Sequence, residues 1–274
     1  MKHTIWVLAL LILGCNQPPN QNTSQLESES LKIVSKISKS DHFKVIHVFV
    51  ALCDNEHQGI QKVPSKIGNG QDSENNLYWG CDLGTKTFLK NHKDWQLVQT
   101  SQNPKENVLE RCLFKHKATN TLLVADAYDG EFIKKCTSDF LQSCSGNFND
   151  TFVFRKDSIA CGGSSDLLSY IGHDGLMEFR LDDVFAPKDT LQREAIILAC
   201  ISKSYFEPYL KQTGAKPLIW TTGLMAPEAY TLVEAIDKWI LKKDKNVIRE
   251  AAAQAYHQYQ KCGIKAARNL LVNE

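Results

Sequence analysis

A histidine and a cysteine each follow an apolar run of the chain, and the two runs are neighbours in the sequence. The run 166–171 leads into Gly172 and His173, and the run 194–199 leads into Cys200. A thiol beside an imidazole can attack a carbonyl carbon while the ring moves the proton. These residues therefore indicate thiol-dependent cleavage of an amide bond, provided that the fold brings them together.

Polar residues also follow three further apolar runs, at 45–52, 121–125 and 217–221. The residues at these three ends are Asp54, Asp126 and Thr222. If the runs are parallel strands, their carboxyl ends share one rim of a sheet, which is where open α/β sheets bind ligands. We expect these residues and Asp174 to orient His173 or to bind the substrate. Asp54 can alternatively cap the segment that follows it.

Apolar runs alternate with longer segments of helical periodicity along the chain. The predicted helices are 76–90, 131–144, 201–212, 227–242 and 246–262. Such alternation is typical of an α/β fold in which helices cover both faces of a mainly parallel sheet. The length of the segment 31–274 suits a single domain of this class.

The two motifs resemble those of clan CD cysteine peptidases, the group of caspases, legumains, gingipains, clostripain and separase. The stretch LLSYIGHDG supplies His173, and AIILAC supplies Cys200. The resemblance covers roughly 45–222 and implies a caspase-like fold in which the two strands are neighbours. It also implies that Cys200 is the nucleophile, that His173 is the proton donor, and that the N–H groups of Gly175 and Cys200 hold the oxyanion.

One residue departs from the pattern of that clan, in which a glycine directly follows the histidine. Here Asp174 intervenes and Gly175 comes second. A carboxylate beside an oxyanion hole opposes the developing charge unless it points away. Asp174 therefore favours one alternative, in which the same fold is a non-catalytic binding or envelope-assembly module. A second alternative is a thiol enzyme for a non-peptide amide. The segments VFVALCDN, NNLYWG, IGHDGLM and GLMAPEAY are also similar to an uncharacterised bacterial family, which implies no activity.

A nucleophilic Cys200 requires a lowered pKa. The start of the helix 201–212 and a nearby imidazolium predict such a lowering. The alternative is that Cys200 is a packed strand-end thiol and His173 a hydrogen-bonded turn residue. No C-x-x-C, H-E-x-x-H or glycine-rich phosphate motif occurs, so the sequence predicts neither a metal site nor a cofactor. Disulfides remain possible among the cysteines of an exported chain.

The first thirty residues indicate a lipid-anchored bacterial protein. The segment 1–14 has a short positive start and an apolar core, and it ends directly before Cys15 in the stretch ILGC. This order is typical of a lipoprotein signal peptide, after which Cys15 is acylated, and an ordinary secretory signal is the alternative. The polar segment 15–30 predicts a flexible tether. We expect the domain to sit in the periplasm or at the cell surface, held to the inner or outer membrane.

The charge pattern argues against nucleic acid as a partner. The formal net charge is +1 at pH 7, and the basic residues are scattered along the chain. A sequence without clustered basic residues does not indicate binding of nucleic acid. The expected partners are the membrane, through Cys15, and a peptide or other amide substrate; no protein partner can be inferred.

Overall fold

Residues 43–274 are described by the computed structural model of this chain. The predicted signal peptide 1–14, the lipidation site Cys15 and the tether 15–30 lie outside the described residues. Within the described part, no helix is both long enough and apolar enough to cross a membrane.

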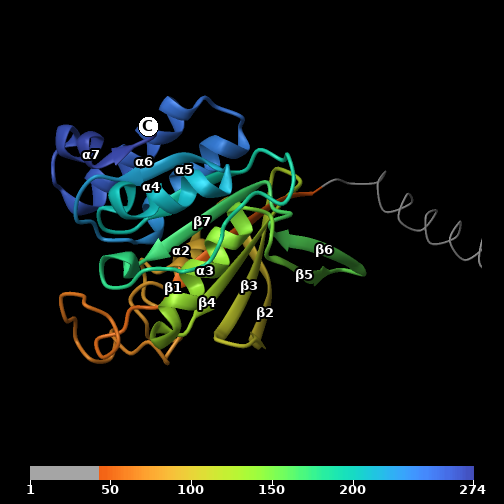
Figure 1. Cartoon of the computed structure of the whole chain (residues 1–274), viewed down its shortest axis with the longest axis horizontal. Coiled ribbons are helices and arrows are strands. Elements are labelled where there is room, and N and C mark those ends of the chain that lie inside the picture. Colours follow the sequence, from red (N-terminus) through yellow and green to blue (C-terminus); the bar gives the residue numbers. More distant parts are fainter. Residues whose placement is uncertain (1–42) are drawn as a thin grey trace, which may run out of the picture. The chain divides into compact units, whose positions relative to one another are not determined.

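A sheet of eight strands forms the centre of the fold, in the order β10-β9-β8-β7-β1-β4-β3-β2 (Figure 1). Its strands are β1 (Lys44–Ala51), β2 (Trp95–Lys105), β3 (Val108–His116), β4 (Thr121–Tyr128), β7 (Leu167–Gly172), β8 (Glu194–Leu198), β9 (Lys216–Thr221) and β10 (Leu271–Val272). The strands from β9 to β4 run parallel, whereas β2, β3 and β10 are antiparallel additions at the edges. The predicted α/β fold with a mainly parallel sheet is therefore confirmed.

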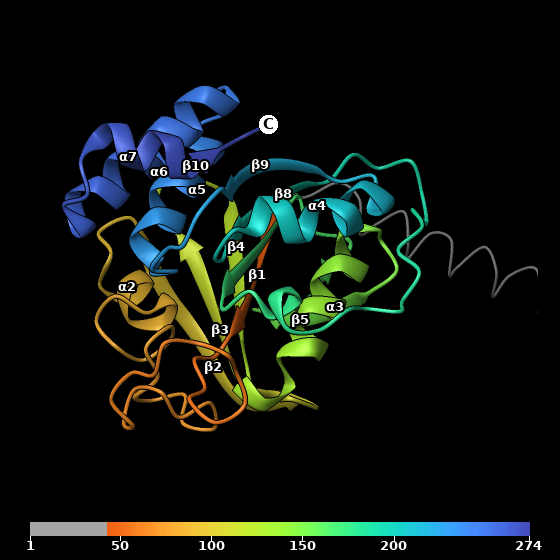
Figure 2. The same cartoon turned by 60° about the vertical axis from the view of Figure 1, so that its left-hand side comes forward.

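Helices cover both faces of the sheet, as the turned view in Figure 2 shows. The helices are α2 (Thr85–Asn91), α3 (Ile133–Cys144), α4 (Ser202–Thr213), α5 (Ala229–Ile240), α6 (Lys245–Gln260) and α7 (Ile264–Leu270), with the short 3₁₀ turns η1 (Gly130–Phe132) and η2 (Gly175–Met177). The first face packs against α3 and α4, and the second against α2, α5 and α6. A separate hairpin of β5 (Asn149–Phe154) and β6 (Asp157–Gly162) follows α3.

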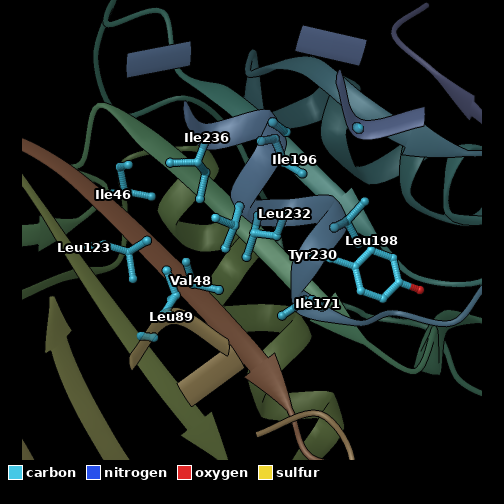
Figure 3. Packing of buried hydrophobic residues seen from close by; sticks show 14 of the residues in the cluster. Ile46, Val48, Leu89, Leu123, Ile171, Ile196, Leu198, Tyr230, Leu232 and Ile236 are labelled. Carbon is cyan, nitrogen blue, oxygen red and sulfur yellow. The ribbon is translucent and has the colours of Figure 1, made fainter. Parts of the chain in front are cut away.

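The central strand β1 is buried on both of its faces. Ile46 and Val48 point to the same apolar cluster as Leu232 of α5 (Figure 3). Phe49 points to the opposite face, where its ring packs edge-on against Phe140 of α3 at a centroid distance of 5.9 Å. A strand that is covered on both faces must be apolar almost throughout, which is why the run 45–52 reads as unbroken hydrophobic sequence.

The predicted helix 76–90 is wrong over residues 76–84, because helix α2 begins only at Thr85. The side chain of Asn76 accepts a hydrogen bond from the Cys53 N–H and donates to the Cys53 carbonyl. It thereby ties this segment to the end of β1 in a series of turns. At Gly80 a Cβ atom would lie 1.9 Å from the Glu74 carbonyl oxygen, so the turn excludes every other residue.

A buried network of charges joins β1, β3 and β4. Asp126 lies opposite Arg111 in the antiparallel pairing, and the Arg111 Nε and Nη2 atoms donate to its carboxylate at 2.6 and 2.7 Å. His47 Nε2 completes the contact at 3.1 Å. Burial opposes ionisation of Asp126, but the hydrogen bonds from Arg111 and His47 hold its pKa well below the usual range. The carboxylate is thus charged, paired and structural.

The network predicts a large cost for removing one partner. Arg111→Met leaves the Asp126 carboxylate buried without its guanidinium, so the free energy of unfolding at pH 7 should fall by about 3–5 kcal/mol. Urea unfolding followed by circular dichroism measures this loss. The control Arg180→Met, at an exposed arginine, should stay within about 0.5 kcal/mol of the wild type. A network variant that unfolds like the control contradicts this role for the ion pair.

Candidate functional site

The strands that carry His173 and Cys200 are adjacent and parallel, as the sequence predicts. Ile171 of β7 is paired with Leu198 of β8. His173 and Cys200 each lie two residues beyond these partners, so the two side chains leave neighbouring strands at the same rim of the sheet. The fold therefore meets the first requirement for joint chemistry.

A glycine is required directly before His173. Gly172 has a φ angle of +146°, and a Cβ atom there would lie 2.6 Å from the Ala51 carbonyl oxygen at the end of β1. Only glycine adopts this conformation without strain and allows such a close approach. Gly172 thus fixes the path on which the chain leaves β7 and presents His173.

The turn that carries Cys200 is strained. Ile201, between Cys200 and α4, has φ 51° and ψ 28°, in the left-handed region that β-branched residues avoid. Its N–H donates to the Gly223 carbonyl at 2.9 Å. The Ser202 N–H donates to Thr221 Oγ1 at 3.1 Å and holds the start of the helix. Strain of this kind costs about 1–3 kcal/mol and persists where the surroundings enforce it.

The Cys200 thiol is covered by the main chain of Met225. Its Sγ atom lies 3.4 Å from the Met225 nitrogen and 3.5 Å from the Met225 oxygen. Burial raises the pKa of Cys200, the N–H of Met225 opposes this, and the negative charge of Asp174 raises it further. The predicted lowering of this pKa is therefore wrong, because desolvation outweighs the N-terminal dipole of α4.

His173 is held by a glutamate that the sequence analysis did not single out. Its Nε2 atom lies 2.6 Å from Glu178 Oε1, which also accepts from the Gly59 N–H at 2.7 Å. The His173 carbonyl accepts from the Tyr170 hydroxyl at 2.7 Å, and the residue is only 8% exposed. A carboxylate on one ring nitrogen fixes the orientation and tautomer of the other.

Asp174 is a buried carboxyl group with only half of its hydrogen-bonding capacity used. Its Oδ1 atom accepts from the Leu176 N–H at 3.1 Å and caps η2. Among the described residues, its Oδ2 atom has no partner. Burial raises the pKa of Asp174 to about 7, and the nearby Glu178 contributes to this rise. The group is thus close to half-protonated at neutral pH.

Asp54 has the capping role that was the alternative interpretation. Its Oδ1 atom accepts from the N–H groups of Glu56 and His57 at 2.9 and 3.3 Å. Its Oδ2 atom contacts His57 Nδ1 at 2.8 Å and Gln71 Nε2 at 3.1 Å. Burial opposes ionisation, but these hydrogen bonds lower the pKa of Asp54. They tie the loop after β1 to itself.

Asp126 is not placed as the sequence predicts, whereas Thr222 directly follows the carboxyl end of β9, as predicted. β4 continues to Tyr128, so Asp126 lies inside the strand and belongs to the charge network with Arg111 rather than to the rim. Thr222 is exposed and donates from Oγ1 to the Asn269 carbonyl at 2.7 Å. The preceding residue, Thr221, takes the place beside the Cys200 turn.

Gly175 begins η2, and a Cβ atom there would lie 2.5 Å from the ring of Phe179. Its N–H group is predicted to hold an oxyanion together with that of Cys200. That role stays a prediction, since these contacts do not test it.

Tyr78 also belongs to this region, although its position in the sequence gives no signal of a site. Burial raises the pKa of its hydroxyl, and the neighbouring thiols of Cys53 and Cys200 add to the rise. Burial raises the pKa of Cys53 to about 11. All eight cysteines in the described part of the chain are free thiols.

A cavity of about 510 Å³ opens beside the rim, between η2 and α4. Its walls include the apolar and aromatic side chains of Leu176, Phe179, Tyr205 and Tyr209. Glu178 also lines it, and the same residue contacts His173. The cavity is therefore linked to the candidate site through one side chain.

Comparison with protein-family models, with curated proteins and with solved structures gives no match for this chain.

The raised pKa of Asp174 predicts a pH-dependent cost. The unfolded carboxyl ionises near pH 4 and the folded one near 7, so stability is complete below about pH 4 and falls as pH rises toward 7. Asp174→Asn keeps the Leu176 contact without the charge. It should be more stable than the wild type at pH 8 by up to about 4 kcal/mol, and much less so at pH 5. Urea unfolding at both pH values tests this, with the exposed Asp82→Asn as control. An equal gain at both pH values contradicts it.

The thiols should differ in their rates of alkylation. Cys262 is exposed, whereas Cys200 is half-buried and has a raised pKa. Iodoacetamide should therefore label Cys262 first at pH 7.5, and labelling of Cys200 should rise as pH exceeds about 8.5, the value for a free cysteine. Mass spectrometry identifies each modified residue. Labelling of Cys200 ahead of Cys262 at neutral pH would reveal an activated thiol instead.

Proposed function

We propose that this chain is a thiol-dependent amide hydrolase, with Cys200 as the nucleophile and His173 as the proton carrier. One observation supports this most strongly: the two residues occupy matching positions at the ends of adjacent parallel strands. The contact of 2.6 Å between His173 and Glu178 adds the third group of a nucleophile, base and orienter arrangement.

The reaction follows from these groups. His173 accepts the Cys200 proton, and because Glu178 occupies Nε2, the transfer uses Nδ1. The thiolate attacks the carbonyl carbon, the amine leaves with the proton from His173, and water then hydrolyses the thioester to regenerate the thiol. The N–H groups of Gly175 and Cys200 hold the oxyanion. Asp174 does not oppose that charge in its neutral form, so the raised pKa of this carboxyl reduces the difficulty raised by its position.

The covering main chain sets a condition on the substrate. Met225 presents both its N–H and its carbonyl to Cys200 Sγ, so an acyl group must approach the half-buried sulfur from another side or displace this segment. Displacement would remove the Met225 N–H that opposes the rise in the pKa of Cys200, so the substrate or solvent must supply a donor in its place.

The neighbouring cavity suggests the class of side chain that is recognised. Its walls of Phe179, Tyr205 and Tyr209 favour an apolar or aromatic group next to the scissile bond. We further propose that acylation of Cys15 holds the enzyme at the bacterial cell envelope.

A second function is favoured by a specific observation. The raised pKa of Cys200 and its two contacts with Met225 are also what a packed, unreactive thiol would have. In that case the rim and its cavity form a binding module that retains the fold without catalysis.

Peptide hydrolysis separates the two functions. The detergent-solubilised full chain is incubated with a library of internally quenched peptides rich in apolar and aromatic residues. Turnover should be abolished by Cys200→Ala and reduced by about 10²-fold or more by His173→Ala. Glu178→Gln should lower kcat and shift the pH profile, because it weakens the orientation of His173. Cys262→Ala is the matched control and should not change the rate. Turnover that survives Cys200→Ala contradicts Cys200 as the nucleophile, and absence of turnover in the wild type favours the binding module.

A further inference from the structure

Three potential metal ligands converge at a place remote from the candidate site. His92, Asp94 and Asp237 each offer a ligand atom, and these atoms all lie within 4.8 Å of one another. His92 caps the end of α2, and Asp94 directly precedes β2. Asp237 lies eight residues beyond the start of α5, about 12 Å along the helix from its first residue. Among residues 43–274, no other group of this kind is present.

The backbone holds the first two ligands in place. The Trp95 N–H donates to the His92 carbonyl at 3.3 Å, and the Lys117 N–H donates to the Asp94 carbonyl at 2.8 Å. The segment between α2 and β2 is thus fixed from both sides. A preorganised set of ligands loses less entropy when it binds an ion.

The third ligand is fixed by a buried indole. Trp95 is almost completely buried, and its Nε1 atom donates to Asp237 Oδ1 at 3.3 Å. This contact leaves Oδ2 of the same carboxylate for another partner.

His116 packs against the indole that holds Asp237. His116 pairs with Trp95 across the two strands, and the two rings meet edge-on at a centroid distance of 5.1 Å. Its Nδ1 atom is engaged by Thr119 Oγ1 at 2.9 Å.

We propose that His92, Asp94 and Asp237 form a binding site for a divalent transition metal, with Zn²⁺ as the preferred ion. Imidazole and carboxylate are donors that Zn²⁺ accepts in tetrahedral sites. At metal–ligand distances of about 2.1 Å, the donor atoms lie about 3.4 Å apart. The observed atoms, all within 4.8 Å of one another, must therefore move closer when the ion binds. Two carboxylates neutralise the charge of the ion.

The metal would join three elements of the fold. It connects the end of α2 and the start of β2 to the last turns of α5, beside the existing hydrogen bond from Trp95 to Asp237. The expected role is structural, because the site is distant from Cys200 and supports the helix that begins beside it.

Binding of Zn²⁺ to the full chain in detergent, stripped with a chelator, tests the proposal. The starting protein is Cys262→Ser, which removes the exposed thiol as a competing ligand. Isothermal titration should show one ion per chain, and tryptophan fluorescence should change with the same dependence, because the Trp95 indole contacts Asp237. With Co²⁺, the absorption spectrum should show tetrahedral coordination without a thiolate charge-transfer band.

Variants identify the ligands. Asp237→Asn keeps an acceptor for Trp95, and His92→Gln and Asp94→Asn alter exposed or half-buried groups, so at least two of the three should fold. Each should weaken Zn²⁺ binding tenfold or more. The control His57→Gln changes a histidine that also pairs with a carboxylate, Asp54 at 2.8 Å, and should bind like the starting protein. Absence of saturable binding, or equal binding by His92→Gln, Asp94→Asn and the control, overturns the proposal.

Discussion

The parallel pairing of β7 with β8 is the constraint on which the candidate site depends. It brings the ends of two strands to one rim, and the close approach of Gly172 to Ala51 sets the direction in which the chain leaves β7. Both consequences are geometric and follow from the sheet rather than from any attraction between His173 and Cys200. The positions of His173 and Cys200 at this rim are therefore a consequence of the fold alone.

Two buried carboxyl groups, one in the interior and one at the rim, have pKa values shifted in opposite directions. Asp126 receives a bidentate guanidinium and an imidazole, and its pKa is held low. Asp174 receives a single N–H, and its pKa rises to about 7. The same residue type, equally buried, is stabilised as an anion in one place and destabilised in the other. Poorly compensated charge of the second kind gathers preferentially at functional sites.

The sequence predicts the central part of the fold well, because a parallel strand that is buried on both faces must be continuously apolar. It also predicts that His173 and Cys200 leave adjacent strands, since strand ends are readable from the same runs. The prediction of a helix at 76–90 fails because the first part of this segment forms turns that are held by the Asn76 side chain. Apolar periodicity does not encode such a side-chain contact. β4 extends past Ala125 because its polar residue is satisfied by Arg111 from the neighbouring strand.

The candidate site is less predictable because its properties depend on contacts that are distant along the chain. Glu178 follows His173 by five residues, but only the turn η2 folds its carboxylate back onto the ring. The pKa of Cys200 depends on Met225, which is 25 residues further on. A helix N-terminus lowers a thiol pKa only when solvent or a donor compensates for desolvation, and that balance is decided by the covering segment.

Two energetic costs meet at the rim, and their coincidence bears on whether it is functional. The left-handed conformation of Ile201 costs about 1–3 kcal/mol. The half-satisfied carboxyl of Asp174 adds a cost of similar size at neutral pH. Together they are a substantial fraction of a typical folding free energy of about 5–15 kcal/mol. A thiol that merely fills space needs neither. Glycine adopts a left-handed turn with less strain, and an apolar residue would fit the site of Asp174 without charge. Both costs accord with the proposed function, in which the turn presents Cys200 at the end of β8 and a titratable carboxyl lies beside the thiol.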